Sequence, residues 1–369
     1  MYCSATRWTR TRFHEFFRWT HILLTMAFLF TAYYHEPQTL YPVIVSLALL
    51  CLEWLPRLLK MLIPLPKATT TIYPSNIIRL SIPLPLNPLS KLLWRTWSPG
   101  SHIRLTIPSI GILQPHPFTI ASLPSDGTLH LYISAKRGLT RRLYEKAAAA
   151  VILQRQLYLN VKMEGVYSAK DTGFAKFDVV LLIASGIGIT FTFPILRDLV
   201  QKAKILQQGN CRCRRIGFVW AVKHESTPIP PPHPTTPAYT KVPSLTVVEL
   251  SCFSTELSAL MENAHGLVAL RLYITRGDQL QGDLTTPTTS PKREKAAEIP
   301  STLVPFVRRS RPKVQGLVEQ AVEEAVVMGR LGVGVCGNRG LTTEVKNCVA
   351  GKLGTGMPDI YCHAEEFEG

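Results

Sequence analysis

Two glycine-containing motifs in the second half of the chain could bind a nucleotide. The segment 184–190 reads Ala-Ser-Gly-Ile-Gly-Ile-Thr and lies between a continuous apolar run and a helical stretch. A strand, a glycine turn and a helix N-terminus together bind pyrophosphate, because exposed backbone N–H groups and the helix dipole attract anions. The motif departs from G-x-G-x-x-G, so on its own it could equally be an ordinary strand-to-helix turn. Its candidate ligands are Ser185, Gly186, Gly188, Ile189 and Thr190.

The second motif, Val335-Cys336-Gly337-Asn338, ends the last strand expected in the chain. Ligands of open α/β sheets lie at the carboxyl ends of the strands. Cys336 there could contact a nicotinamide, with the backbone of Gly337 beside it. The alternative, at even weight, is a cysteine that simply fills the core.

Two other motifs lie in β-rich sequence. In His116-Pro117-Phe118-Thr119-Ile120, proline keeps the backbone extended and Thr119 could donate to an isoalloxazine ring. The same residues could also form a turn and an edge strand. In the segment 136–142, Gly138 allows close backbone approach, Thr140 could cap the next helix, and Lys136 adds positive charge for a phosphate. A capped helix with a solvated basic turn explains this segment equally well.

Two histidines lie in an apolar segment near the N-terminus. His21 and His35 are fourteen positions apart, which returns to nearly the same helix face about 21 Å further along. Ionisable residues inside a membrane helix are usually functional, and each histidine could ligate one heme iron. The alternative is that both histidines lie at the interface between membrane and water.

Apolar segments at about 16–35 and 40–62 have nearly the length needed to cross a bilayer. Arginines precede the first segment, basic residues follow the second, and the short link between them has none. The positive-inside rule then places both ends in the cytosol. Residues 1–66 are therefore predicted to anchor an integral membrane protein in lipid, with cytosolic C-terminal domains.

Composition narrows the class of protein. The 369 residues are 46% hydrophobic and carry a formal net charge of +16. The basic residues do not alternate with aromatic ones as they do in nucleic-acid-binding proteins, so no nucleic-acid partner is expected. Eight scattered cysteines indicate reduced thiols rather than a zinc site.

The remaining sequence predicts two domains. Residues 67–168 contain short β-rich runs at 77–82, 103–107 and 129–134, separated by turn signals, which indicates an antiparallel β-barrel. A helix is expected at 139–150. Residues 175–369 read as an α/β parallel-sheet domain with loops at 227–240 and 279–313. The strands expected there are 179–184, 216–222, 244–250, 268–275 and 332–336, and a helix is expected at 314–328.

The order of these motifs resembles the ferric reductase and NADPH oxidase superfamily, specifically the fungal ferric-chelate reductases. The resemblance covers nearly the whole chain apart from the two loops. It includes the heme histidines at His21 and His35, the flavin motif at 116–120, the flavin pyrophosphate segment at 138–140, the nucleotide loop at 185–196, and Cys336-Gly337 near the nicotinamide. It implies a ferredoxin-reductase-type FAD domain and an NADP domain. In this family NADPH reduces FAD, and heme b carries the electrons across the plasma membrane to Fe(III) chelates in iron uptake.

Three departures limit what the resemblance transfers. The family has about six membrane helices and takes half of its heme ligands from a helix that has no match here, so a partner or a longer natural chain would have to supply it. Gly-Pro-Tyr-Gly of the family is replaced near 165–168, and Phe367 stands near the place of the terminal aromatic that covers the flavin. The alternatives are an anchored NADPH diaphorase without heme, a degenerate non-catalytic membrane fragment, and a heme-binding two-helix protein. The sequence does not decide whether the electron donor is NADPH or NADH. It also does not decide whether the acceptor is iron, copper or oxygen.

Overall fold

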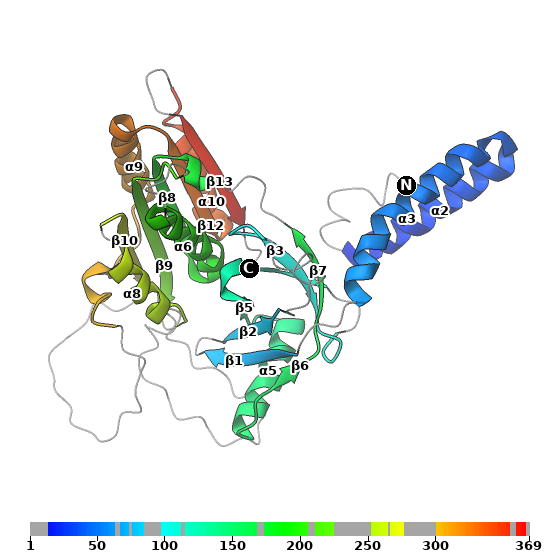
Figure 1. Ribbon diagram of the computed structural model, residues 1–369, viewed down its shortest axis with the longest axis horizontal. Coiled ribbons are helices and arrows are strands. Elements are labelled where there is room, and N and C mark those ends of the chain that lie inside the picture. The colour runs from blue at the N-terminus through cyan, green and yellow to red at the C-terminus, as the bar shows by residue number, and fades with distance from the viewer. Residues whose placement is uncertain are drawn as a thin grey trace. The chain divides into compact units, whose positions relative to one another are not determined.

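The structure is a computed structural model that describes residues 14–62, 67–73, 76–84, 97–111, 115–167, 173–205, 211–224, 252–264, 266–276, 300–354 and 359–366. The chain divides into two compact units, Met1–Ile63 and Pro64–Gly369. The first unit holds α2 (His14–His35), the 3-10 turn η2 (Pro37–Thr39) and α3 (Leu40–Leu62). Figure 1 shows the two helices running antiparallel.

The two helices of the first unit coincide with the apolar segments predicted at 16–35 and 40–62. Thr39 fixes the link between them, since its hydroxyl lies 2.7 Å from the Glu36 carbonyl oxygen and 3.1 Å from that of Ala32. Of the helices in the described residues, none is both long enough and apolar enough to cross a bilayer. The prediction that α2 and α3 span a membrane stays a prediction.

Antiparallel strands build the first part of the second unit. One sheet has the order β5-β2-β1-β6 and the other has the order β4-β3-β7. Their bounds are β1 (Ala68–Tyr73), β2 (Ile77–Pro83), β3 (His102–Thr106), β4 (His116–Thr119), β5 (Thr128–Ser134), β6 (Tyr158–Leu159) and β7 (Lys162–Tyr167).

These two sheets meet at both edges. β6 runs on into β7 through Asn160 and Val161, and the amide of Ala121, just after β4, donates to the His130 carbonyl of β5 at 2.9 Å. Alternate residues such as Leu80 and Leu105 point inward and are fully buried. The strands therefore close into the antiparallel barrel that the sequence predicts, and α5 (Leu139–Ile152) buries Leu143 in the same core.

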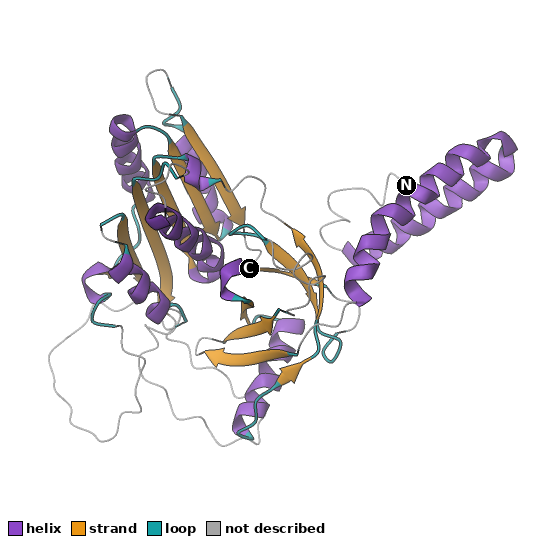
Figure 2. Ribbon diagram, in the orientation of Figure 1, coloured by secondary structure: helices purple, strands orange, loops and turns teal. Residues whose placement is uncertain are grey.

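A parallel sheet forms the second part of this unit, with the order β11-β10-β9-β8-β12-β13. Its strands are β8 (Val179–Ser185), β9 (Arg215–His224), β10 (Val268–Arg276), β11 (Val307–Arg308), β12 (Leu331–Gly337) and β13 (Ile360–Glu366). Its helices are α6 (Ile189–Ile205), α8 (Ser254–Asn263), α9 (Val314–Met328) and α10 (Arg339–Ala350). Figure 2 shows helices on both sides of the sheet.

The central strand β8 is buried on both faces. Val180 and Leu182 pack in the core cluster that contains α6 residues, while Val179 and Leu181 pack in the cluster that contains α9 residues. This explains why its sequence is a continuous apolar run instead of an alternating one. The strand order reverses at β8: the chain adds β9, β10 and β11 on one side of β8, and then β12 and β13 on the other side.

The structure corrects part of the predicted element map. The loop predicted at 279–313 is wrong at its C-terminal end, because η6 (Val304–Phe306) and β11 lie there and Val307 of β11 pairs with Leu272 of β10. β13 was not predicted, since its mixed sequence fills only half-buried edge positions. The predicted loop 227–240 and the strand predicted at 244–250 lie outside the described residues.

Candidate functional site

The two nucleotide motifs meet at the centre of the parallel sheet. Ala184 of β8 and Cys336 of β12 are Cα partners in neighbouring strands. One residue further, a Cβ atom on Gly337 would lie 3.0 Å from the Cβ atom of Ser185. The strand order reverses between these two strands, and ligands of open α/β sheets bind at such a reversal. Residues far apart in the sequence thus form one candidate site.

The turn after β8 is a 3-10 turn, η5 (Gly186–Gly188), and leads directly into α6. Gly186 has φ of 52°, a left-handed conformation that favours glycine. The Trp220 indole of β9 donates to the Gly186 carbonyl at 2.9 Å and fixes the turn from the adjacent strand. Sequence reasoning missed Trp220, although a tryptophan in the strand next to a glycine turn is a signal that could have identified it.

Three predicted ligands flank this turn and differ in what they can offer. Ser185 is half-buried at the strand end, whereas Ile189 and Thr190 are buried. The Thr190 hydroxyl donates to the Ile187 carbonyl at 2.9 Å, so it stabilises the turn. Ile189 has an apolar, buried side chain, so only its backbone could contribute to binding.

Cys336 is 1% exposed and packs in the core cluster on the α6 side of the sheet. Burial raises the pKa of its thiol, and the nearby carboxylate of Glu365 adds to the increase. The thiol therefore stays protonated. The side chain of Cys336 therefore fills the core, as the alternative interpretation of the sequence expected. A contact with a nicotinamide stays a prediction.

The residue after Gly337 begins α10. Asn338 is the N-cap residue of this helix, and its Oδ1 atom accepts from the Leu341 amide at 2.9 Å. Asn338 stabilises the helix start by pairing an amide that the helix leaves without a partner.

The predicted flavin motif is strand β4. Phe118 pairs with Ile103 and Thr119 pairs with His102 across the β3–β4 ladder. His116 and Phe118 place their ring centroids 6.5 Å apart, and Pro117 is exposed. The motif is thus an edge strand of its sheet, as the second of the two sequence interpretations expected. A contact with the flavin ring stays a prediction.

A cluster of titratable residues, which the sequence did not single out, connects β3 with β13. His102 stacks on Tyr167 with ring centroids 5.3 Å apart, and burial lowers its pKa against the attraction of Glu365. His363 Nε2 and Glu365 Oε1 are 2.9 Å apart, and this hydrogen bond lowers the pKa of the Glu365 carboxyl despite burial. Glu365 is the Cα partner of Cys336, so the cluster links the flavin motif to the nucleotide motif.

The basic turn before α5 has a different cap from the one predicted. Gly138, with φ of 61°, is the N-cap residue, and a Cβ atom there would meet nothing within 4 Å. Thr140 lies inside the helix, where its Oγ1 atom accepts from the Lys136 amide and donates to the Arg137 carbonyl, both at 3.1 Å. The prediction that Thr140 caps the helix is wrong, because its hydroxyl closes the turn instead. The open space at Gly138 and the exposed Lys136 leave this helix start accessible to an anion.

The two predicted heme ligands belong to the first unit. His21 and His35 both lie on α2 with exposed side chains. Within the described ranges, no group of three or more His, Cys, Asp or Glu side chains could hold a metal ion. Phe367 lies outside the described residues.

Comparisons with known proteins agree with this geometry. Residues 62–171 match the FAD-binding domain family, and residues 177–227 match the ferric reductase NAD binding domain family. Ferric reductase transmembrane component 1 of Schizosaccharomyces pombe is 24% identical over 259 residues, which cover 60% of this chain and 44% of that protein. Human dual oxidase 1 is 32% identical over 126 residues, which cover 34% of this chain and 8% of that protein.

Among solved structures, a ferredoxin NADP+ reductase from Neisseria gonorrhoeae with bound FAD and NADP matches with a TM-score of 0.45 and 13% identity, covering 82% of this chain and 99% of that one. The chain spans less than half the length of the ferric reductase that it matches. The barrel followed by the parallel sheet, together with the two family matches, shows that the chain carries an FAD-binding domain and a ferric reductase NAD binding domain.

Proposed function

We propose that the chain passes electrons from NADPH through FAD as the dehydrogenase part of a membrane-bound, ferric-chelate reductase-like protein. One observation carries the proposal: Ser185 and Gly337 meet at the reversal of strand order, and Glu365 connects this edge electrostatically to His102 beside the flavin motif. A hydride donor and its acceptor must come within van der Waals contact, so their two binding motifs have to lie at one junction.

The residues at this junction fit both cofactors. The open helix start at Gly138, with Lys136 beside it, suits the pyrophosphate of FAD. Strand β4 would hold the flavin ring with His116, Pro117, Phe118 and Thr119. The turn at Gly186–Gly188 and the backbone of Gly337 would hold the nicotinamide nucleotide. When bound, FAD supplies the conversion of a two-electron donor into single electrons.

The membrane half of the proposal rests on α2 and α3. Large apolar side chains are exposed along both helices, including Phe28 at 62%, Phe30 at 70% and Leu52 at 66%. Such surfaces require lipid or a protein partner. We place these helices in the plasma membrane, as an anchor over 1–66, with the domains at 67–168 and 175–369 in the cytosol. His21 and His35 would each supply one ligand to a heme b, with the opposing ligands from helices outside this chain.

The acceptor in this proposal is an Fe(III) chelate on the far side of the membrane, in iron uptake. Without the additional helices, the same chain would act as an anchored NADPH diaphorase that reduces soluble acceptors. The alternative to an enzyme is a degenerate, non-catalytic membrane fragment. Only the departures from the family motifs favour it.

The test uses the full chain purified in detergent and incubated with FAD. We expect stoichiometric flavin absorbance and NADPH-dependent reduction of ferricyanide, with NADH compared under the same conditions. Gly186→Val should abolish turnover, because valine disfavours a φ of 52°. Gly354→Ala is the matched control, since a Cβ atom there meets nothing within 4 Å. A folded protein that binds no FAD, or binds FAD without NADPH oxidation, would overturn the proposal.

A further inference from the structure

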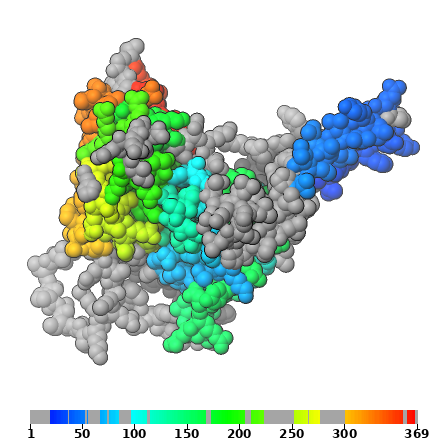
Figure 3. All heavy atoms as spheres, in the orientation of Figure 1, coloured from blue at the N-terminus to red at the C-terminus, as the bar shows by residue number. Residues whose placement is uncertain are grey.

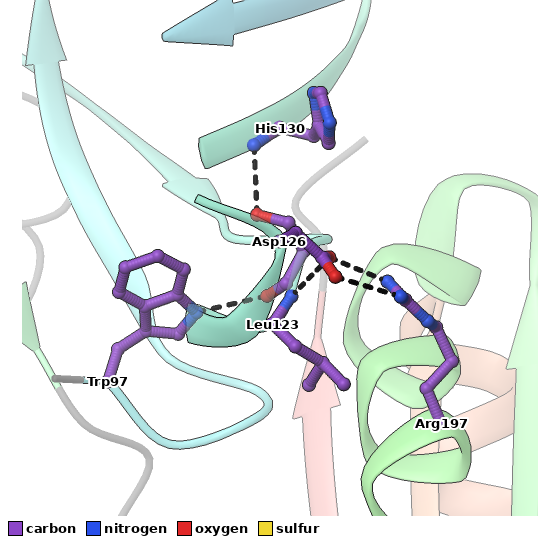
Figure 4. A network of polar contacts seen from close by, with 6 residues as sticks. Trp97, Leu123, Asp126, His130 and Arg197 are labelled. Atoms are coloured by element: carbon purple, nitrogen blue, oxygen red, sulfur yellow. Dashed lines mark hydrogen bonds and ion pairs between the residues drawn. The ribbon is translucent and has the colours of Figure 1, made fainter. Parts of the chain in front are cut away.

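A bidentate ion pair joins the barrel to the parallel-sheet domain. Arg197 Nη1 lies 2.8 Å from Asp126 Oδ2, and Arg197 Nη2 lies 2.9 Å from Asp126 Oδ1 (Figure 4). Two parallel hydrogen bonds between a guanidinium and a carboxylate fix orientation as well as distance. The side chains are only 24% and 21% exposed, so water screens the pair less than a fully exposed one.

The barrel side of this pair is held rigidly. Asp126 ends the turn η3 (Pro124–Asp126), which connects the flavin strand β4 to β5, and its Oδ2 atom also accepts from the Leu123 amide at 2.9 Å. The neighbouring Ser122 carbonyl accepts from the Trp97 indole, and the Ser122 hydroxyl accepts from the His130 amide, both at 3.0 Å. Figure 4 shows these contacts around the turn.

The carboxyl of Asp126 stays charged in this setting. Burial raises its pKa, but the hydrogen bonds from Arg197 and the Leu123 amide outweigh burial and hold the pKa below its usual range. The pair is therefore ionic throughout the range in which the protein would work.

The second residue of the pair, Arg197, belongs to the helix that follows the nucleotide turn. Arg197 lies in the middle of α6, whose first residue follows η5 directly. The same helix packs on the barrel near its start, where a Cβ atom on Gly100 would lie 2.7 Å from the Phe191 ring and 3.5 Å from Ile195. In Figure 3 the cyan atoms of the barrel and the green atoms of this domain are in contact.

We propose that Asp126 and Arg197 are a positioning pair that sets how the nicotinamide approaches the flavin. The pair connects the segment that follows β4 to the helix that follows the nucleotide turn, so it fixes the two binding motifs relative to each other. This inference rests on the proposed function. Misplacing reacting groups by about 1 Å can slow a reaction about a hundredfold, so a positioning role predicts a loss in rate that exceeds any loss in binding.

A purely structural role is the alternative. The interface already has apolar contacts, since Tyr132 of β5 and Phe253 of the sheet domain place their rings 4.3 Å apart. Removal of the ion pair should thus leave the two domains folded and in contact. The measurement has to separate positioning from stability.

The test measures flavin reduction by NADPH in a single turnover, using the FAD-loaded full chain. Arg197→Ala should lower the limiting rate constant at least about tenfold with little change in the NADPH dissociation constant. Arg197→Lys keeps the charge but not the bidentate geometry, so its rate constant should lie between those of the wild type and Arg197→Ala. Lys202→Ala is the matched control, because it removes an ion pair to Asp198 at 2.7 Å within the same helix.

A second readout needs no flavin. In the FAD-free chain, Arg197→Ala should speed amide hydrogen exchange over residues 121–130, while Lys202→Ala should not. An Arg197→Ala variant with the wild-type rate constant, or a Lys202→Ala variant that is slowed equally, would overturn the positioning role. A wild-type protein that shows no flavin reduction by NADPH would instead overturn the proposed function.

Discussion

Gly337 and Ser185 face each other across the two strands where the order of the parallel sheet reverses. A side chain on Gly337 would contact both Ser185 and Leu341, each with an atom 3.0 Å from the new Cβ. This close approach brings the backbones of two strand ends together where the strand order reverses, which is where open α/β sheets bind nucleotides.

The first prediction concerns this approach. Gly337→Ala should weaken NADPH binding about tenfold, because the methyl group must push Ser185 or the start of α10 aside. FAD content should stay unchanged, since the barrel motif is on other strands. Titration of the oxidised protein with NADP+ measures the affinity, and an unchanged dissociation constant would place the nucleotide elsewhere.

The second prediction concerns the contact between α6 and the barrel. Gly100 combines φ of 85° with a Cβ position 2.7 Å from the Phe191 ring. Gly100→Ala should therefore lower the free energy of unfolding by about 1–3 kcal/mol, from backbone strain and steric overlap together. Gly127→Ala has a positive φ but open space, so it should show the strain alone. Equal effects of the two substitutions in thermal denaturation would contradict this assignment.

The third prediction concerns Trp220. Trp220→Phe removes the donor to the Gly186 carbonyl while keeping most of the buried aromatic surface. The loss should cost about 1–2 kcal/mol of stability, and the KM for NADPH should rise because the turn is no longer fixed. Steady-state kinetics with ferricyanide gives the KM, and a reduced melting temperature with an unchanged KM would limit Trp220 to a structural role.

The fourth prediction concerns pH. Burial lowers the pKa of His102, with Arg104 acting in the same direction and Glu365 opposing both, and burial also lowers that of His130. A histidine that is neutral when folded takes up its proton on unfolding, so the unfolded state binds more protons below the ordinary pKa of about 6.5. Stability should decrease as the pH falls from about 7 through 6.

His102→Gln should flatten this pH dependence without abolishing it, because His130 contributes in the same direction. The ion pair of Asp126 is lost only at much more acidic pH, since its pKa lies below the usual carboxyl range. Chemical denaturation at a series of pH values measures the slope. A variant with the wild-type slope would show that His102 titrates alike in both states.

The sequence predicted the elements whose patterns are local. The apolar run of β8 reflects burial on both faces, and the helix predicted at 314–328 has the bounds of α9, Val314–Met328. β13 could not be predicted in this way, because its side chains are half-buried without any alternation and its stability comes from pairing with β12. Pairing between distant strands leaves little trace in either sequence.

The same distinction holds for the site. The turn at Gly186 and the strand end at Gly337 were recognisable because backbone geometry demands glycine there. His102, Glu365 and Arg197 were not, because the attraction between His102 and Glu365 and the pairing of Arg197 with Asp126 arise only when the barrel meets the parallel sheet. Thr140 was assigned to a cap by its type alone, whereas the structure uses its hydroxyl to close the preceding turn.

The closure of the barrel also bears on how the protein behaves at high concentration. An open antiparallel sheet exposes a row of amides and carbonyls to which a second chain can add a strand. Here the amide of Ala121 pairs with the His130 carbonyl, and β6 continues into β7, so the edges of the two described sheets lie against each other. Misfolding that separates these edges would expose unpaired strands, to which other chains can add.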